Sequence, residues 1–278
     1  MEKILLAIDG INLNKKALEF ACYLARLTKS KVTGIFLENG VSEQRPIVKQ
    51  MYETTALGWE LDEIPVHKTK TGCIENNIAL FKEGCTAREV NHSLHRDRGL
   101  PAKELIGESR FADLLVLDPE TSFNDRFEEV PSEFVKDILR KTECPVIIAP
   151  EDFAAIDEIL FLYDGSASCV FAIKQFTYLF PQFARKKACI LNVNHTGDWL
   201  DTHKHKFSEL LKSHYGDIKF EILKGHTDTL FLETVVARKN TFVVMGAYGR
   251  NTVSMFFKSS HADMLIKTGL QPIFIAHL

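Results

Sequence analysis

Short apolar runs alternate with longer segments of helical periodicity in the second half of the chain. The apolar runs that we predict to be strands are 158–163, 187–193, 219–223, 241–245 and 271–276. The segment 168–180 has apolar residues at mixed three- and four-residue spacing and is predicted to be a helix. A polar helix is predicted at 201–214, and further helices at 227–238 and 260–267. Such alternation is typical of βαβ units. The pattern therefore predicts an open, five-stranded parallel sheet with right-handed crossovers and helices on both faces.

The first half follows the same order of elements. Its predicted strands are 3–8, 31–37, 88–95, 114–117 and 145–149. Its predicted helices are 12–28, 102–109 and 131–141. Pro131 fits the first turn of the last helix, where its missing N–H is not needed.

Two segments of the first half recur in the second. Ile-Leu-Leu-Ala-Ile-Asp-Gly at 4–10 returns as Ile-Leu-Phe-Leu-Tyr-Asp-Gly at 159–165. Pro-Val-Ile-Ile-Ala at 145–149 returns as Pro-Ile-Phe-Ile-Ala at 272–276. The first pair of segments is 155 residues apart and the second pair 127, so the first copy carries 28 extra residues. An internal repeat of this kind predicts two copies of one fold.

The repeat divides the chain into two predicted domains. The first is 1–152 and holds an insert at about 38–84, and the second is 153–278. We expect each domain to be α/β, with a five-stranded open parallel sheet and helices on both faces.

Composition and charge narrow the function classes. The chain is 45% hydrophobic and 26% charged, which is typical of a globular protein and excludes collagen-like, coiled-coil and wholly disordered chains. The 278 residues carry 34 Lys and Arg against 37 Asp and Glu, a net charge of -3, so we expect no nucleic acid or membrane partner. No apolar run approaches the roughly 20 residues of a membrane helix.

We expect a cytoplasmic location. Residues 1–10 hold only a six-residue apolar stretch and lack the pattern of a signal peptide. The six cysteines are scattered without a Cys-x-x-Cys pair, which favours reduced, buried thiols.

One segment carries candidate binding chemistry. Residues 245–260 leave a predicted strand and enter a predicted helix. Gly246 and Gly249 allow a sharp turn and a close approach of the backbone to a ligand. Ser259 and Ser260 can cap the helix, whose N–H groups attract anions. In an open α/β sheet this loop lies at the carboxyl edge of the strands, close to the loop at 164–166.

These residues resemble the universal stress protein family, whose nucleotide-binding members carry Gly, two residues, Gly, nine residues, then Gly and Ser or Thr. Gly246, Gly249 and the Ser259–Ser260 pair match in length and in every landmark except the third glycine. Other matching landmarks are Asp-Gly-Ser at 164–166, Leu-Asn-Val at 191–193, Lys-Gly at 224–225 and Pro-Ile-Phe-Ile at 272–275. Both copies fit, so the chain is similar to a tandem universal stress protein over nearly its whole length.

The resemblance implies a Rossmann-like fold of the adenine nucleotide alpha hydrolase type, and a stress-response function. It implies that the second copy binds ATP or a related adenine nucleotide, with Mg²⁺. The implied binding residues are Asp164 at the ribose or adenine, Val193 in the adenine slot, Met245, Gly246 and Gly249 beneath the phosphates, Arg250 as added charge, and Ser259 and Ser260 holding the phosphates.

Ser259 departs from the family pattern, because its side chain occupies space where the family has glycine. This difference can weaken, alter or abolish nucleotide binding. The alternative interpretation is that Gly246 and Gly249 only shape a loop and that Ser260 only caps a helix.

The corresponding loop of the first copy, residues 117–130, predicts no nucleotide site. It has no glycine and carries five carboxylates, which would repel polyphosphate unless a metal intervened. Asp9 is retained there. The copies also differ in charge, because residues 1–150 have a net charge of -4 and residues 151–278 of +1.

Other chemistries have weaker signals. His203 and His205, with His195 and His214, allow a metal site, but surface histidines are the simpler interpretation. Cys73 and Cys85 allow a redox pair, against the simpler interpretation of two unrelated thiols. ATP hydrolysis would be slow at most, because it requires a base or metal-held water for which only Asp164 and Asp263 are candidates.

Two function classes stay open. The first is a nucleotide-responsive stress protein that acts through an unidentified protein partner. The second is an interaction or scaffold module whose loops no longer bind nucleotide.

In the family the final strands of two domains pair, so the resemblance implies that 146–149 and 273–276 meet edge to edge as an intramolecular pseudo-dimer. A homodimer of the whole chain is compatible with the sequence, which does not decide it.

Overall fold

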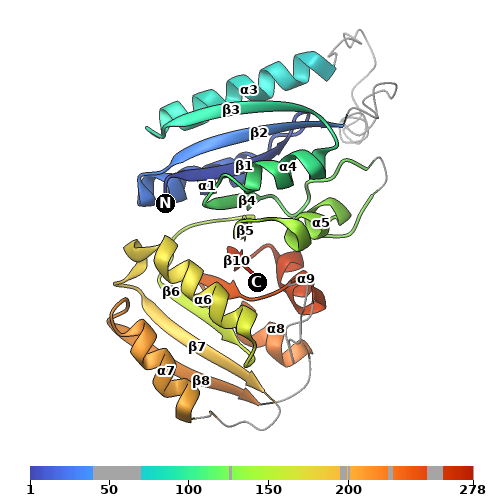
Figure 1. Ribbon diagram of the computed structural model, residues 1–278. Coiled ribbons are helices and arrows are strands. Elements are labelled where there is room, and N and C mark those ends of the chain that lie inside the picture. Colours follow the sequence, from blue (N-terminus) through green and yellow to red (C-terminus); the bar gives the residue numbers. More distant parts are fainter. Residues whose placement is uncertain are drawn as a thin grey trace, which may run out of the picture.

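The described part of the chain forms one ten-stranded sheet with helices on both faces (Figure 1). This computed structural model describes residues 1–39, 70–124, 127–194, 199, 201–224, 228–248 and 259–277. The strand order is β3-β2-β1-β4-β5-β10-β9-β6-β7-β8. The first five strands along the chain therefore make one half of the sheet, and the last five make the other.

The strands of the first half are β1 (Lys3–Asp9), β2 (Lys31–Asn39), β3 (His92–Gly99), β4 (Leu114–Leu117) and β5 (Val146–Ile148). Those of the second are β6 (Glu158–Tyr163), β7 (Lys187–Asn194), β8 (Asp217–Lys224), β9 (Thr241–Met245) and β10 (Ile273–Ile275). Within each half all pairings are parallel. The α/β fold class predicted from the sequence is confirmed.

The helices connect successive strands. They are α1 (Lys15–Thr28), α3 (Lys70–Ala87), α4 (Pro101–Ser109), α5 (Glu133–Lys141), α6 (Ala167–Leu179), α7 (Asp201–Leu211), α8 (Asp228–Val236) and α9 (Ser259–Thr268), with a 3₁₀ turn at Pro181–Phe183. Polar N-caps start three of them, because the side chains of Asn14, Ser132 and Ser166 accept backbone N–H groups of α1, α5 and α6.

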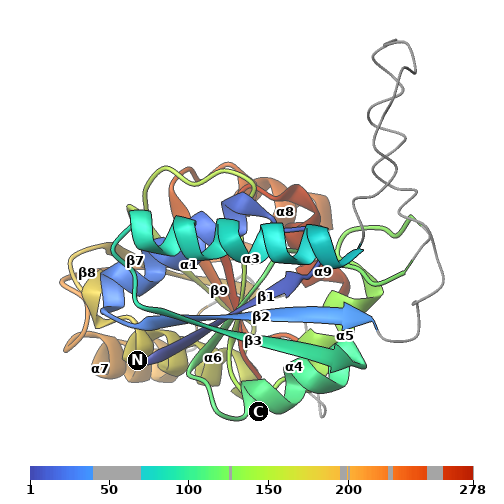
Figure 2. The same cartoon turned by 90° about the horizontal axis from the view of Figure 1, so that it is seen from above.

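Aromatic packing places α1 and α6 on the same face of the sheet. The ring of Phe242 in β9 lies 5.0 Å from that of Phe176 in α6 and 6.3 Å from that of Phe20 in α1. One side chain of a strand points to one face only, so both helices cover that face. Figure 2, which looks along the sheet from its β3 edge, shows the strands fanning around a common centre as the sheet twists.

The two halves join through an antiparallel pair of strands. β10 pairs with β5 so that Ile273 faces Ile148, Phe274 faces Ile147 and Ile275 faces Val146. This confirms the predicted edge-to-edge contact. Because 146–148 and 273–275 are the repeated segments, a local two-fold axis passes through the Ile147–Phe274 pair.

Several boundaries differ from the sequence prediction. The helix predicted at 12–28 begins at Lys15, and the one predicted at 201–214 ends at Leu211. The strand predicted at 88–95 begins only at His92, because α3 continues to Ala87 and a turn follows, with Glu89 at a φ of 56°. Pro131 does not lie in the first turn of α5, because Ser132 is the N-cap, its hydroxyl accepting the N–H of Val135 at 3.2 Å. Residues 40–69 of the predicted insert lie outside the described residues, while 70–84 belong to α3.

The exposed edges of the sheet are polar. The edge strands β3 and β8 carry charged residues along their length, a common means of preventing pairing with another chain. Among the described residues, no helix combines the length and apolar character that crossing a membrane requires.

The junction provides a stability test. Phe274 is fully buried and its ring lies 5.3 Å from that of Phe176. Because Phe274→Ala leaves a cavity where the two halves join, we expect it to lower the free energy of unfolding by about 3–5 kcal/mol in urea titrations. Leu270→Ala, four residues earlier and 58% exposed, is the matched control and should change it by less than about 0.5 kcal/mol. Equal effects of both would contradict a packed junction.

Candidate functional site

The candidate site of the second half lies where the strand order reverses. β6 continues through α6 to β7 on one side, whereas β9 continues through α9 to β10 on the other, and β6 and β9 are neighbours. The carboxyl ends of two such strands flank a crevice, the usual ligand position in open α/β sheets. The loop predicted from the sequence starts at this place, because β9 ends at Met245 and α9 begins at Ser259.

Asp164 follows β6 at the edge of the crevice and is 7% exposed. Its Oδ1 accepts the N–H of Ser166 at 2.9 Å and the thiol of Cys169 at 3.1 Å. Gly165, with a φ of 91°, makes the turn that L side chains rarely adopt, and space lies open beside it. Burial and the charge of Asp164 raise the pKa of Cys169 to about 12, so this thiol stays protonated.

Gly246 rests directly on the first turn of α6. A Cβ at this position would lie 2.3 Å from the carbonyl carbon of Ser168 and 2.4 Å from the nitrogen of Cys169. Real Cβ atoms do not approach backbone this closely, so only glycine fits here. The sequence indicated a glycine near a ligand, and the structure adds a packing requirement between β9 and α6.

Tyr248 links the start of the loop to α9. It has a φ of 62°, and its hydroxyl donates to a carboxylate oxygen of Asp263 in α9. Burial raises the pKa of Tyr248 far above the usual value, and the hydrogen bond to Asp263 and the negative charge of Asp263 raise it further. Asp263, which sequence reasoning named as a base, is therefore engaged by a side chain of the loop.

The remaining predicted binding residues divide into three groups. Val193 and Met245 are buried at the ends of β7 and β9, 1% and 0% exposed. Ser259 and Ser260 are the first two residues of α9. Gly249 and Arg250 lie outside the described residues. The roles assigned to all of these residues stay predictions.

An aromatic cluster that the sequence analysis missed lies beside Asp164. The Tyr163 hydroxyl is 2.8 Å from Nδ1 of His203, and its ring stacks on Trp199 at 5.9 Å and meets Phe207 edge-on at 4.8 Å. Burial, together with Cys169 and Asp164, raises the pKa of Tyr163 to about 12. His203 thus contacts a tyrosine. His195 lies outside the described residues, and within those described no group of acidic, His or Cys residues is arranged to hold a metal.

The equivalent position in the first half is closed. Asp9, Asn14, Asp118 and Thr121 surround a space of about 10 Å³, the room for one water. Asp118 Oδ1 accepts the N–H of Glu120 at 3.2 Å. Burial raises the pKa of Asp118, and the bonds from Asn14 and Glu120 oppose this shift only in part.

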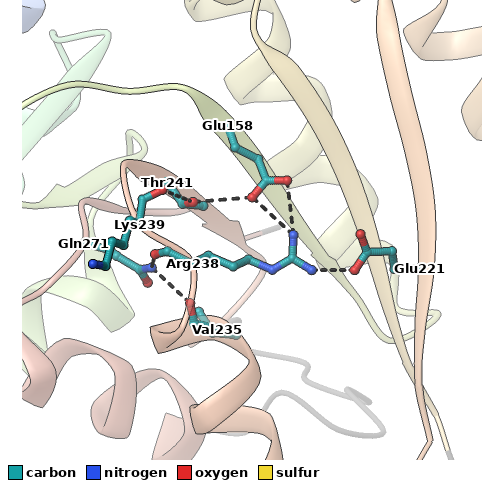
Figure 3. Close-up of polar contacts among 7 residues, drawn as sticks. All are labelled: Glu158, Glu221, Val235, Arg238, Lys239, Thr241 and Gln271. Carbon is teal, nitrogen blue, oxygen red and sulfur yellow. Dashed lines mark hydrogen bonds and ion pairs between the residues drawn. The ribbon is translucent and has the colours of Figure 1, made fainter.

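A structural ion cluster lies at the opposite edge of the second half (Figure 3). Arg238 Nη1 contacts both carboxylate oxygens of Glu158 at 3.1 Å, and its Nη2 contacts Glu221. Glu158 is the first residue of β6, so the cluster sits at the amino ends of the strands, away from the crevice. Through these contacts Arg238, which precedes β9, is bound to Glu158 of β6 and Glu221 of β8.

All six cysteines are free thiols in this structure, and all except Cys73 are buried. Cys85 does not pack against Cys73 but against Cys22, with 3.9 Å between the two sulfur atoms. These residues are 63 positions apart and meet because α1 and α3 are in contact.

Comparisons with known proteins agree with this architecture. No family model matches the chain. The universal stress protein Slr1230 of Synechocystis sp. is 26% identical over 136 residues, which are 48% of this chain and 47% of that protein. The chain thus matches about half the length of this curated relative.

Solved structures match over the whole chain. A universal stress protein from Archaeoglobus fulgidus has a TM-score of 0.70 at 15% identity, covering 99% of this chain and 98% of its own. A functionally unknown protein, PA1789 of Pseudomonas aeruginosa, has a TM-score of 0.55 at 15% identity, covering 99% and 92%. The fold and the switch-point loop define a tandem Rossmann-like protein. The chain is similar to universal stress proteins in sequence over about half its length and in fold over nearly its whole length.

The packing of Gly246 can be tested by a single methyl group. We expect Gly246→Ala to lower the free energy of unfolding by about 3 kcal/mol or more, because the new Cβ overlaps the backbone of α6. Gly216→Ala is the matched control, since nothing lies within 4 Å of its Cβ position, and should change stability by less than about 0.5 kcal/mol. Thermal and urea unfolding provide the measurement, and a Gly246→Ala protein of normal stability would refute the contact.

Asp118 predicts a pH dependence of stability. The pKa of Asp118 is higher in the folded protein than in the unfolded chain, so ionisation of this carboxyl destabilises the fold. The destabilisation is complete when the pH is above the folded pKa, and it is absent when the pH is below the unfolded pKa. Asp118→Asn should therefore be more stable than the natural chain near neutral pH, because every tenfold difference in proton affinity between the folded and unfolded carboxyl is worth about 1.4 kcal/mol. This advantage should vanish in acid. Urea midpoints of both proteins at about pH 4 and about pH 8 test this. An advantage independent of pH would rule out the buried charge as its cause.

Proposed function

We propose that the second half binds ATP or a related adenine nucleotide, with Mg²⁺, in the crevice between β6 and β9, and that the nucleotide state changes how the protein meets a protein partner. One observation carries this proposal. The loop from Gly246 to Ser259 joins β9 to α9 at the point where the strand order reverses, next to Asp164.

Two helix ends support the placement of phosphate there. α6 begins at Ala167 and α9 at Ser259, and both follow strands whose carboxyl ends border the crevice. The N-termini of helices carry partial positive charge and unpaired N–H groups, which favour anions. We assign the ribose or adenine to Asp164 and Val193, the phosphates to Gly246, Gly249, Ser259 and Ser260, and further contacts to Met245 and Arg250.

The first half lacks room for the same ligand. Its equivalent space holds about one water, and the carboxylates of Asp9 and Asp118 border it. Placing polyphosphate there would add like charge to a buried acid. This supports a single nucleotide site per chain.

The scaffold alternative has one observation in its favour. The contact of Gly246 with α6 explains this glycine without any ligand. Ser259, where the family pattern has glycine, is consistent with a loop that no longer holds phosphate.

Domain limits and location belong to the same proposal. We divide the chain at 152, between β5 and β6, so that each domain holds five strands. We propose a cytoplasmic location, because all six cysteines are free and five of them are buried.

The test is calorimetric titration of the nucleotide-free chain with ATP and Mg²⁺. Gly246→Val does not serve as the binding variant, because it would disrupt packing on α6. Ser260→Asp adds negative charge where phosphate would bind, yet acidic residues in a first helical turn stabilise the helix by about 0.3–1 kcal/mol. We therefore expect saturable binding by the natural chain, and at least about tenfold weaker binding by Ser260→Asp without any loss of thermal stability.

The matched control is Thr229→Asp, which places the same charge in the first turn of α8 at an exposed position. It should bind as the natural chain does. If the natural chain shows neither heat nor a thermal shift at millimolar ATP, the nucleotide proposal fails and the scaffold alternative stands.

A further inference from the structure

Two buried cysteines meet where α1 packs against α3. The Sγ atoms of Cys22 and Cys85 are 3.9 Å apart, which is van der Waals contact, and both residues are fully buried. The sulfur atoms of a disulfide are about 2.0 Å apart, so the gap to be closed is about 2 Å. Rotation of the two side chains and a small shift between the helices are enough to close it.

The contact between the two helices is tight at this point. A Cβ at Gly84 would lie 2.8 Å from Cδ2 of Leu18, so a larger residue would displace the leucine of α1. Arg88 Nη1 donates to the carbonyl of Gly84 at 3.1 Å, and its Nη2 pairs with Glu19 of α1 at 2.7 Å. The cysteine pair therefore lies beside both a close packing contact and an ion pair that joins the same two helices.

The other three buried thiols have an oxygen atom as their polar neighbour, and burial raises the pKa of each to about 12. They are Cys144, Cys169 and Cys189. The hydrogen bond from Cys85 lowers the pKa of Cys22 by more than burial raises it, and the positive charge of Arg88 lowers it further, opposed in part by Glu19. The thiolate is the form that reacts with oxidants, so Cys22 is the first of the buried thiols to react.

The sulfur pair lies close to the surface. Arg88 follows Cys85 by three residues and Glu19 precedes Cys22 by three, so both charged residues are neighbours of the sulfurs on their helices. The side chains of Arg88 and Glu19 are 35% and 57% exposed. A small oxidant therefore reaches the sulfurs through brief local opening of this helix pair.

We propose that hydrogen peroxide converts Cys22 and Cys85 into a disulfide that holds α3 against α1. The Cys22 thiolate attacks one peroxide oxygen and the O–O bond breaks, which gives a Cys22 sulfenic acid and a hydroxide that takes up a proton to become water. The Cys85 sulfur then attacks the Cys22 sulfur, and the displaced hydroxide leaves with the thiol proton of Cys85 as a second water. The two thiols lose two electrons and the peroxide gains them. The proposal stands whether or not the crevice binds nucleotide.

The disulfide would close a loop that includes β2 and the insert, because residues 23–84 lie between the two cysteines. α3 also contacts the carboxyl end of β1, since Nδ2 of Asn77 donates to the carbonyl of Gly10 at 3.0 Å. A covalent link between α1 and α3 restricts the unfolded chain. The oxidised protein should therefore resist unfolding more than the reduced protein does.

The test exposes the reduced full chain to hydrogen peroxide, alkylates the remaining thiols and maps the digested protein by mass spectrometry. We expect the loss of two of the six free thiols and one crosslink, between the peptides that contain Cys22 and Cys85. The urea midpoint of the oxidised chain should rise by at least about 0.5 M, and a thiol reductant should return it to its starting value.

Cys22→Ala removes the first nucleophile and should abolish both the crosslink and the rise in the urea midpoint. Cys189→Ala is the matched control, because Cys189 is equally buried but lies in β7 of the second half, and it should keep both. Retention of all six thiols, a crosslink between other cysteines, or a Cys22–Cys85 crosslink that leaves the midpoint unchanged or lower would overturn the proposal. These three outcomes are measured on the natural chain, so they do not depend on the folding of the variants.

Discussion

The antiparallel pairing of β5 with β10 is the constraint on which the rest of the structure depends. Strands within each half are parallel, and only this pair runs in opposite directions. The carboxyl ends of the two halves therefore lie at opposite edges of the sheet. The crevice between β6 and β9 and its counterpart between β1 and β4 cannot combine into one site. Each half has to make its own crevice, so one can be lost while the other stays open.

The two halves differ at the carboxyl ends of their strands. In the first half, Asp9, Asn14, Asp118 and Thr121 border a space of about 10 Å³, which is room for one water. In the second half, no atom lies within 4 Å of the position that a Cβ on Gly165 would take. The linker that follows β5 also packs on α1 of the first half, through the contact of Phe153 with Tyr23.

Much of the fold could be predicted from sequence because most strands are buried on both faces. The segments forming β1, β4 and β9 are nearly continuous apolar runs, and their limits agree with prediction within one or two residues. β3 was misplaced for the opposite reason, since an edge strand with charged residues has no such run. The start of α5 depended on a hydroxyl of Ser132, which the adjacent proline obscured.

The candidate site could be predicted only where its residues directly follow predicted strands. Gly246, the start of α9 and Asp164 follow predicted strands, so topology alone brings them to one edge. The contact of Gly246 with Ser168 joins residues about 80 positions apart, and the hydrogen bond between Tyr163 and His203 joins residues about 40 positions apart. Such contacts arise only from tertiary packing, so the sequence pattern could not predict them.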